Sequence, residues 1–105
     1  MKVGFACDSN EGLNSKISAH FGRAPYFIIV EIEKNKEPEY LKTVKNPVIE
    51  NHQLGEIPSL MINEGVELMV SGGMGRRAQE YFAIRNIRVI TGKEGKIINV
   101  IKEII

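Results

Sequence analysis

The sequence contains one cysteine, Cys7, among its 105 residues. A single cysteine excludes an internal disulfide and any Cys-x-x-Cys motif for metal binding or redox chemistry. No apolar run approaches the ~20 residues that span a bilayer. Residues 1–5 also lack the charged lead and the long apolar stretch of a signal peptide. We therefore expect a chain with no membrane partner, located in the reducing cytoplasm.

A strong charge of either sign is also missing. The chain has 14 basic and 13 acidic residues and a formal net charge of +1, so no global charge bias recruits nucleic acid or an anionic membrane. Hydrophobic residues make up 43% and charged residues 26%, which is typical of folded globular proteins and argues against disorder. The length predicts a single domain over residues 1–105.

Short runs of apolar, β-branched and aromatic residues predict five strands. They cover residues 2–7, 26–33, 40–45, 67–71 and 88–91. Because residues 34–39 separate the second run from the third with a proline, these two strands are expected to form a hairpin.

Apolar residues at helical spacing predict three helices. The first carries Leu54, Ile57 and Met61 and stops near Gly65, and the second runs from residue 74 to about residue 86. The isoleucine-rich tail from residue 96 fits an amphipathic helix. A strand remains open there, because isoleucine favours both burial and β structure.

This order of elements predicts an α/β fold with a mixed sheet and helices on its faces. Short strand–helix–strand connections require parallel strands and right-handed crossovers, whereas the leading hairpin is antiparallel. Ligands of such sheets sit at the carboxyl ends of the parallel strands. The turn that starts at Gly72 and the loop that follows Cys7 are therefore expected side by side.

The loop before the second strand is the first candidate site. Residues 18–27 hold one histidine, one arginine and three aromatic residues, and binding residues concentrate in loops held by a rigid scaffold. His20 suits a metal ligand or a proton carrier near neutral pH, and Arg23 suits an anion. The alternative is a histidine that is hydrogen-bonded within the loop, with Phe21 and Phe27 as core anchors and Arg23 solvated.

The second candidate site is a glycine-rich turn that follows a strand and opens a helix. Its residues are Gly72, Gly73, Met74, Gly75, Arg76 and Arg77. Free N–H groups and the helix dipole favour an anion at such a position. Arginines in a first helical turn oppose the dipole at about 0.3–1 kcal/mol each, a penalty that an anionic ligand would reverse. The turn matches no P-loop or dinucleotide-binding fingerprint, and the alternative is a tight turn with solvated arginines.

Candidate metal ligands near this end of the sheet are Cys7, His20, His52 and Met74. Thiolate and imidazole suit iron–sulfur centres, zinc or copper, but the spacing matches no standard zinc or ferredoxin pattern. Cys7 could equally be a small buried hydrophobic residue, and His52 a surface or capping residue.

No catalytic constellation is legible in the sequence. Asp8 ends the first strand without the further carboxylates that a two-metal nuclease requires, and there is no Ser-His-Asp arrangement or nucleophile elbow. We therefore predict that the chain is not an enzyme.

Two motifs together give the chain a family resemblance over essentially its whole length. They are the stretch from Ser18 through His20 and Arg23 to Phe27 and the turn Gly72 to Gly75, with Asn46-Pro47 between them. On these residues the chain resembles the dinitrogenase iron–molybdenum cofactor biosynthesis family, which includes NifX-like proteins and the C-terminal domain of NifB. The resemblance implies a ribonuclease-H-like three-layer α/β/α fold. Its five-stranded mixed sheet has the order 3-2-1-4-5, with the second strand antiparallel.

The resemblance also implies a function: non-catalytic binding or carriage of an iron–sulfur or iron–molybdenum-type cluster or its precursor. The expected cofactor-binding residues are His20, Phe21, Gly22, Arg23, Gly72, Gly73, Met74, Gly75 and Arg76, and the expected metal ligands are His20, Cys7 and His52. Cluster donor and acceptor proteins are the expected partners, and the chain is expected to be a monomer or a weak homodimer. The alternative is a module that binds a nucleotide or phosphorylated metabolite at the same turn, and a nuclease on this fold is the third hypothesis.

Overall fold

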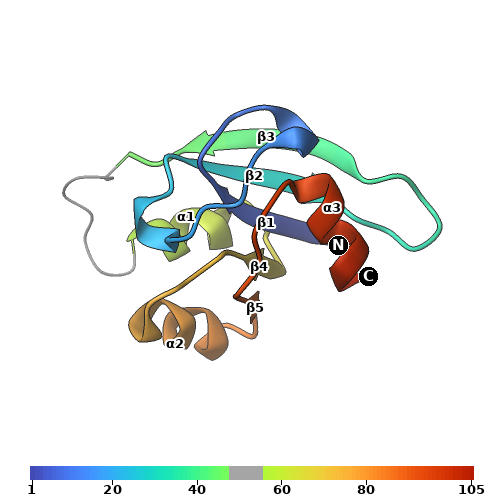
Figure 1. Ribbon diagram of the computed structural model, residues 1–105. Helices are drawn as coiled ribbons and strands as arrows, with labels where there is room; N and C mark the ends of the chain where they lie inside the picture. The colour runs from blue at the N-terminus through green and yellow to red at the C-terminus, as the bar shows by residue number, and fades with distance from the viewer. Residues whose placement is uncertain (48–55) are drawn as a thin grey trace.

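A mixed sheet forms the centre of the computed structural model, which describes residues 1–47 and 56–105 (Figure 1). The strands of the described residues are β1 (Lys2–Cys7), β2 (Tyr26–Glu31), β3 (Glu39–Lys45), β4 (Leu68–Val70) and β5 (Arg88–Ile90). Their order is β3-β2-β1-β4-β5. β2 is antiparallel to β1 and β3, whereas β1, β4 and β5 are parallel. The strand order and the antiparallel second strand are confirmed.

β1 is the central strand, and it is buried on both faces. Val3, Phe5 and Cys7 point into one hydrophobic cluster, and Ala6 points into the other. A strand covered on both faces has a continuous apolar sequence instead of an alternating one. This explains why residues 3–7 contain no charged side chain.

Three helices cover the two faces of the sheet. On one face lie α1 (Glu56–Asn63) and α2 (Arg76–Ile84), and on the other lies α3 (Ile97–Ile104) (Figure 1). Ile97, Val100 and Ile101 are buried on one side of α3. The isoleucine-rich tail is therefore a helix, and the predicted three-layer α/β/α arrangement is confirmed.

The ends of α1 and α2 explain where these helices stop. Gly65 has a φ of 80°, the Val66 N–H donates to the Met61 carbonyl at 3.2 Å, and the Gly65 N–H donates to the Ile62 carbonyl at 3.0 Å. These two hydrogen bonds define a Schellman motif, in which a left-handed residue ends the helix. The same motif follows α2: Asn86 has a φ of 61°, the Ile87 N–H donates to the Phe82 carbonyl at 3.0 Å, and the Asn86 N–H donates to the Ala83 carbonyl at 3.0 Å. Both predicted helix ends are confirmed.

Several predicted boundaries differ by a few residues. β2 ends at Glu31 and not at residue 33, because the chain turns there through Asn35, whose φ is 65°. β4 and β5 have three residues each, and α2 begins at Arg76. Leu54 lies outside the described residues. No described helix is long and apolar enough to cross a membrane.

Candidate functional site

The connection between β1 and β2 lies across the carboxyl ends of the parallel strands. The Ser18 N–H donates to the Ala6 carbonyl at 2.7 Å, the Gly72 N–H donates to the Ser18 carbonyl at 2.8 Å, and the Phe21 N–H donates to the Gly73 carbonyl at 2.9 Å. Backbone hydrogen bonds therefore join the loop directly to the glycine-rich turn. The predicted side-by-side placement is confirmed.

Gly72 and Gly73 are required because the loop backbone lies against them. A Cβ atom on Gly72 would lie 2.7 Å from the Ser18 carbonyl oxygen and 2.8 Å from the Ala19 Cα. A Cβ atom on Gly73 would lie 2.7 Å from the Ala19 carbonyl oxygen. Any side chain at either position would push the loop away, whereas Gly75 has open space around it.

Two buried serines hold the turn and the loop in shape. The Ser71 Oγ donates to the Gly73 carbonyl at 2.8 Å. The Ser18 Oγ donates to the His20 carbonyl at 3.2 Å and accepts from the His20 N–H at 3.2 Å. Sequence reasoning assigned no role to these hydroxyls. Small polar residues that flank a turn commonly bond to nearby backbone in this way, and this was the signal available.

Asn46 ties the loop to the end of β3. Its Nδ2 donates to the Ala24 carbonyl at 2.9 Å and to the Gly22 carbonyl at 3.3 Å, and its backbone N–H donates to the Pro25 carbonyl at 3.0 Å. The side chain is buried. The sequence placed Asn46 in a family motif without showing this structural role.

Phe21 anchors the loop to the hydrophobic core. It is buried, and its ring lies 5.4 Å from the Phe27 ring and 5.7 Å from the Phe82 ring, the second pair being edge to face. Aromatic pairs of this geometry stabilise beyond the area that they bury. Phe21 therefore serves the site as a core anchor, as the alternative interpretation of this residue held.

A pocket of about 420 Å³ lies between the loop and the turn. This volume falls within the range of about 300–1,000 Å³ that is usual for small-ligand sites. Its walls are formed by Ala19, His20, Phe21, Gly22, Arg23, Gly73, Met74 and Gly75. The structure thus brings together all the predicted cofactor-binding residues except Gly72 and Arg76.

His20 and Arg23 are the polar side chains at this pocket. Both are exposed, and neither side chain forms a hydrogen bond or an ion pair with another residue in the described part of the chain. Across residues 1–47 and 57–105, no group of three or more His, Cys, Asp or Glu side chains could hold a metal ion. The pocket therefore offers one imidazole and one guanidinium instead of a complete metal centre.

Cys7 does not line the pocket. Its side chain is fully buried in the hydrophobic cluster beneath α3, whereas Phe21 and Met74 belong to the cluster on the other face. Burial, with a smaller effect of the Asp8 charge, raises the pKa of the Cys7 thiol to about 12. A metal ligand must be a thiolate, so this position favours the alternative of a small buried hydrophobic residue.

Two further predicted residues lie at the edge of the site. Gly72 supports the loop through its backbone but does not line the pocket. Arg76 forms an ion pair with Glu80, Nε to Oε1 at 3.1 Å, and lines a separate groove along α2. His52 lies outside the described residues.

The fold and the pocket define an open α/β domain with its candidate site at the carboxyl ends of β1 and β4. The family model described as "Dinitrogenase iron-molybdenum cofactor" matches residues 1–105, and the chain belongs to this family. The family assignment made from the two motifs is therefore confirmed. No curated protein matches the chain significantly.

Solved structures with the same fold include three with different degrees of sequence identity. The crystal structure of PH0822 is 35% identical, with a TM-score of 0.85 over 99% of this chain and 89% of that one. A putative NifB protein from Thermotoga, TM1290, is 25% identical, with a TM-score of 0.77 over 98% and 85%. The apo form of the orange protein from Desulfovibrio gigas is 19% identical, with a TM-score of 0.81 over 98% and 85%, and shares the fold.

Gly73→Ala tests the close approach of loop and turn. The added Cβ meets the Ala19 carbonyl oxygen at 2.7 Å, so we expect a loss of about 1–3 kcal/mol in the free energy of unfolding. Urea unfolding measures this loss. Gly75→Ala is the matched control, because no atom lies within 4 Å of its Cβ position and its φ is −63°. The control should change stability by less than about 0.5 kcal/mol. Equal losses in the two variants would show that close approach is not the cause.

The buried thiol of Cys7 should make stability depend on pH in the alkaline range. Its ordinary pKa of 9.0 applies to the unfolded chain, and the folded value is about 12. Between these values the folded chain binds more protons than the unfolded chain. The contribution of the buried thiol to the free energy of unfolding is therefore complete below about pH 9. Above that pH it declines by at most about 1.4 kcal/mol per pH unit.

Urea unfolding between about pH 8 and pH 10 should show a steeper loss of stability in the wild type than in Cys7→Ala. Comparing the two slopes removes the effect of the lysines and tyrosines, which the two chains share. Parallel profiles would mean that the thiol titrates normally and is not held in the core.

Proposed function

We propose that the chain binds an iron–sulfur or iron–molybdenum-type cluster, or a precursor of one, as cargo in the pocket beside His20. It carries this cargo from a donor protein to an acceptor protein in the reducing cytoplasm and catalyses no reaction. Membership of the dinitrogenase iron–molybdenum cofactor family supports a role connected with that cofactor. The observation that carries the proposal is the pocket itself, which is bordered by His20 and Arg23, two exposed side chains without partners in the described structure.

The side chains at the pocket suit an anionic, iron-containing cargo. The imidazole of His20 can ligate iron, and the guanidinium of Arg23 can donate hydrogen bonds to anionic sulfur or oxygen. The thioether of Met74 adds a soft, polarisable surface. At Gly75, α2 begins without a side-chain cap, so its first N–H groups are available to negative charge.

The small number of ligands supports carriage over permanent binding. Resident iron–sulfur clusters are usually held by four cysteines, whereas the only described cysteine is buried away from this pocket. A cargo held by one imidazole and by charge complementarity can be released to an acceptor that offers more ligands. The expected acceptor is therefore a protein with a stronger ligand set than this pocket.

Anaerobic loading tests the proposal. Purified chain is incubated with ferrous iron and sulfide and desalted, and iron and sulfide per chain are measured together with visible absorption. The wild type should retain both elements. His20→Ala should weaken retention by at least about tenfold, or about 1.4 kcal/mol, and should unfold at the wild-type temperature because His20 is exposed.

Arg85→Ala is the control for loading, because Arg85 is exposed, does not line the pocket and stacks on the Tyr81 ring at 3.9 Å. It should retain as much iron as the wild type. Undiminished retention in His20→Ala would contradict the assignment of the pocket. Loss of retention in Cys7→Ala at unchanged stability would instead make the thiol a ligand.

A second candidate function is the binding of a nucleotide or a phosphorylated metabolite. The observation in its favour is the uncapped start of α2 at Gly75, which borders the same pocket as Arg23. Inorganic phosphate or ADP at one hundred times its dissociation constant should then raise stability by about 2.7 kcal/mol. A thermal shift without added metal that is lost in Arg23→Ala would support this candidate. The absence of any shift would exclude it.

A further inference from the structure

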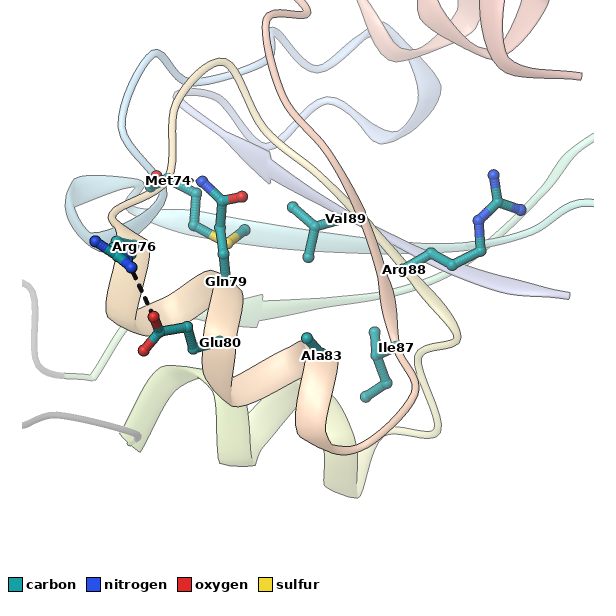
Figure 2. Close-up of a pocket in the computed structure, with 8 residues that line it drawn as sticks. All are labelled: Met74, Arg76, Gln79, Glu80, Ala83, Ile87, Arg88 and Val89. Atoms are coloured by element: carbon teal, nitrogen blue, oxygen red, sulfur yellow. Dashed lines mark hydrogen bonds and ion pairs between the residues drawn. The ribbon is translucent and has the colours of Figure 1, made fainter.

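A second groove, of about 720 Å³, lies between α2 and the edge strand β5 (Figure 2). Four apolar side chains line it: Met74, Ala83, Ile87 and Val89. Arg76 and Arg88 stand at its margins, and Arg76 is paired with Glu80. Met74 also lines the pocket beside His20, so the two surfaces adjoin at this residue.

One side of β5 presents an open backbone edge. β5 is the last strand in the order of the sheet, and no described residue pairs with its outer side. The Arg88 N–H donates to the Glu67 carbonyl at 3.3 Å, and the Ile90 carbonyl accepts from the Ser71 N–H at 3.0 Å. Backbone groups of successive strand residues point to opposite sides, so the N–H and C=O of Val89 face outward. This is the geometry to which a further strand can pair.

The side chains of β5 and of Ile87, the residue before it, define which side chains an added strand would need. Ile87 and Val89 pack with the cluster beneath α2, whereas Arg88 extends from the opposite side of the strand (Figure 2). An added strand would place alternate side chains on the same two sides. Apolar residues would then cover Ile87 and Val89, and acidic residues would lie beside Arg88.

Charge selects the kind of occupant. Among the residues of segment 76–88 that line the groove, Arg76 and Arg88 are basic and Glu80 is acidic, and Arg76 is paired with Glu80, so Arg88 leaves a net positive charge there. In the described structure, Arg88 has no ion-pair partner. A second copy paired through β5 would bring two such segments together, and like charges on facing strands are destabilising. Charge complementarity therefore favours an acidic partner over a second copy.

We propose that the edge of β5 and the adjoining groove bind an extended acidic segment of a partner protein, which pairs as an added strand with apolar and acidic residues in alternation. Strand addition of this kind derives its affinity from main-chain hydrogen bonds and its specificity from alternate side chains. The site goes beyond the carrier role and requires no cargo. It would hold a bound protein next to the pocket beside His20.

Binding of a defined peptide to the whole chain, without cargo, tests this proposal. The probe is an end-blocked, fluorescein-labelled peptide of alternating valine and glutamate, about seven residues long to match a typical strand. Fluorescence anisotropy should show saturable binding with a dissociation constant below about 1 mM. The backbone amide of Val89 should show one of the largest NMR shifts, because it faces the added strand.

Two charge variants separate a specific site from general attraction. Arg88→Glu should weaken binding about tenfold. Arg85→Glu changes the net charge equally, but Arg85 lies outside the groove and stacks on Tyr81, so binding should change by less than about threefold. Every second amide of the peptide can be N-methylated in either of two patterns. The pattern that methylates the amides facing β5 should abolish binding, because it removes the main-chain hydrogen bonds.

Three results would overturn the proposal. The first is equal weakening by Arg85→Glu and Arg88→Glu, or equally strong binding of a peptide of alternating valine and lysine. Either outcome would attribute the binding to nonspecific electrostatic or hydrophobic attraction. The second is no saturable binding up to about 1 mM. The third is a wild-type dimer in sedimentation that protects the Val89 amide from exchange, which would assign the edge to a second copy. Because no cluster is used, none of these results bears on cargo binding.

Discussion

The close backbone contact between the glycine-rich turn and the loop before β2 is the constraint on which the candidate site depends. Gly72 and Gly73 have no Cβ atoms, so the loop can lie directly on the turn and accept or donate backbone hydrogen bonds there. With the loop fixed in this way, Phe21 enters the core while His20 and Arg23 remain exposed. The pocket is the space that this contact leaves between the two segments.

The sheet makes that contact rigid. β1 and β4 are buried beneath helices on both faces, so their carboxyl ends hold the loop and the turn at a constant distance. Met74 lies between two surfaces, because it lines both the pocket beside His20 and the groove along β5. The proposed cargo site and the proposed protein-docking site can thus share one structural support without sharing polar groups. This arrangement suits a protein whose proposed task is to receive and release a cargo.

Most of the architecture could be predicted, since it follows from short-range patterns. Apolar runs predicted the five strands, and helical spacing predicted α1 and α2. The strand order came from the family resemblance, because periodicity alone is compatible with several orders of a mixed sheet. The tail from residue 96 stayed ambiguous, and only its packing showed that Ile97, Val100 and Ile101 form one buried side of a helix. Most of the predicted site residues line one pocket because both motifs sit at strand ends, where topology brings loops together, and their role in binding stays a prediction.

The sequence by itself determined which elements form and which two segments meet, because spacing and glycine placement act over a few residues. Only the tertiary structure decided the fate of particular side chains. It placed Cys7 under α3 and showed Asn46 bonding to the carbonyls of Gly22 and Ala24. The physical reason is that burial, ion pairing and side-chain hydrogen bonding depend on partners that folding brings close. Those partners, such as α3 for Cys7 and the loop carbonyls for Asn46, are far away along the chain or on another face of an element, where no local pattern records them.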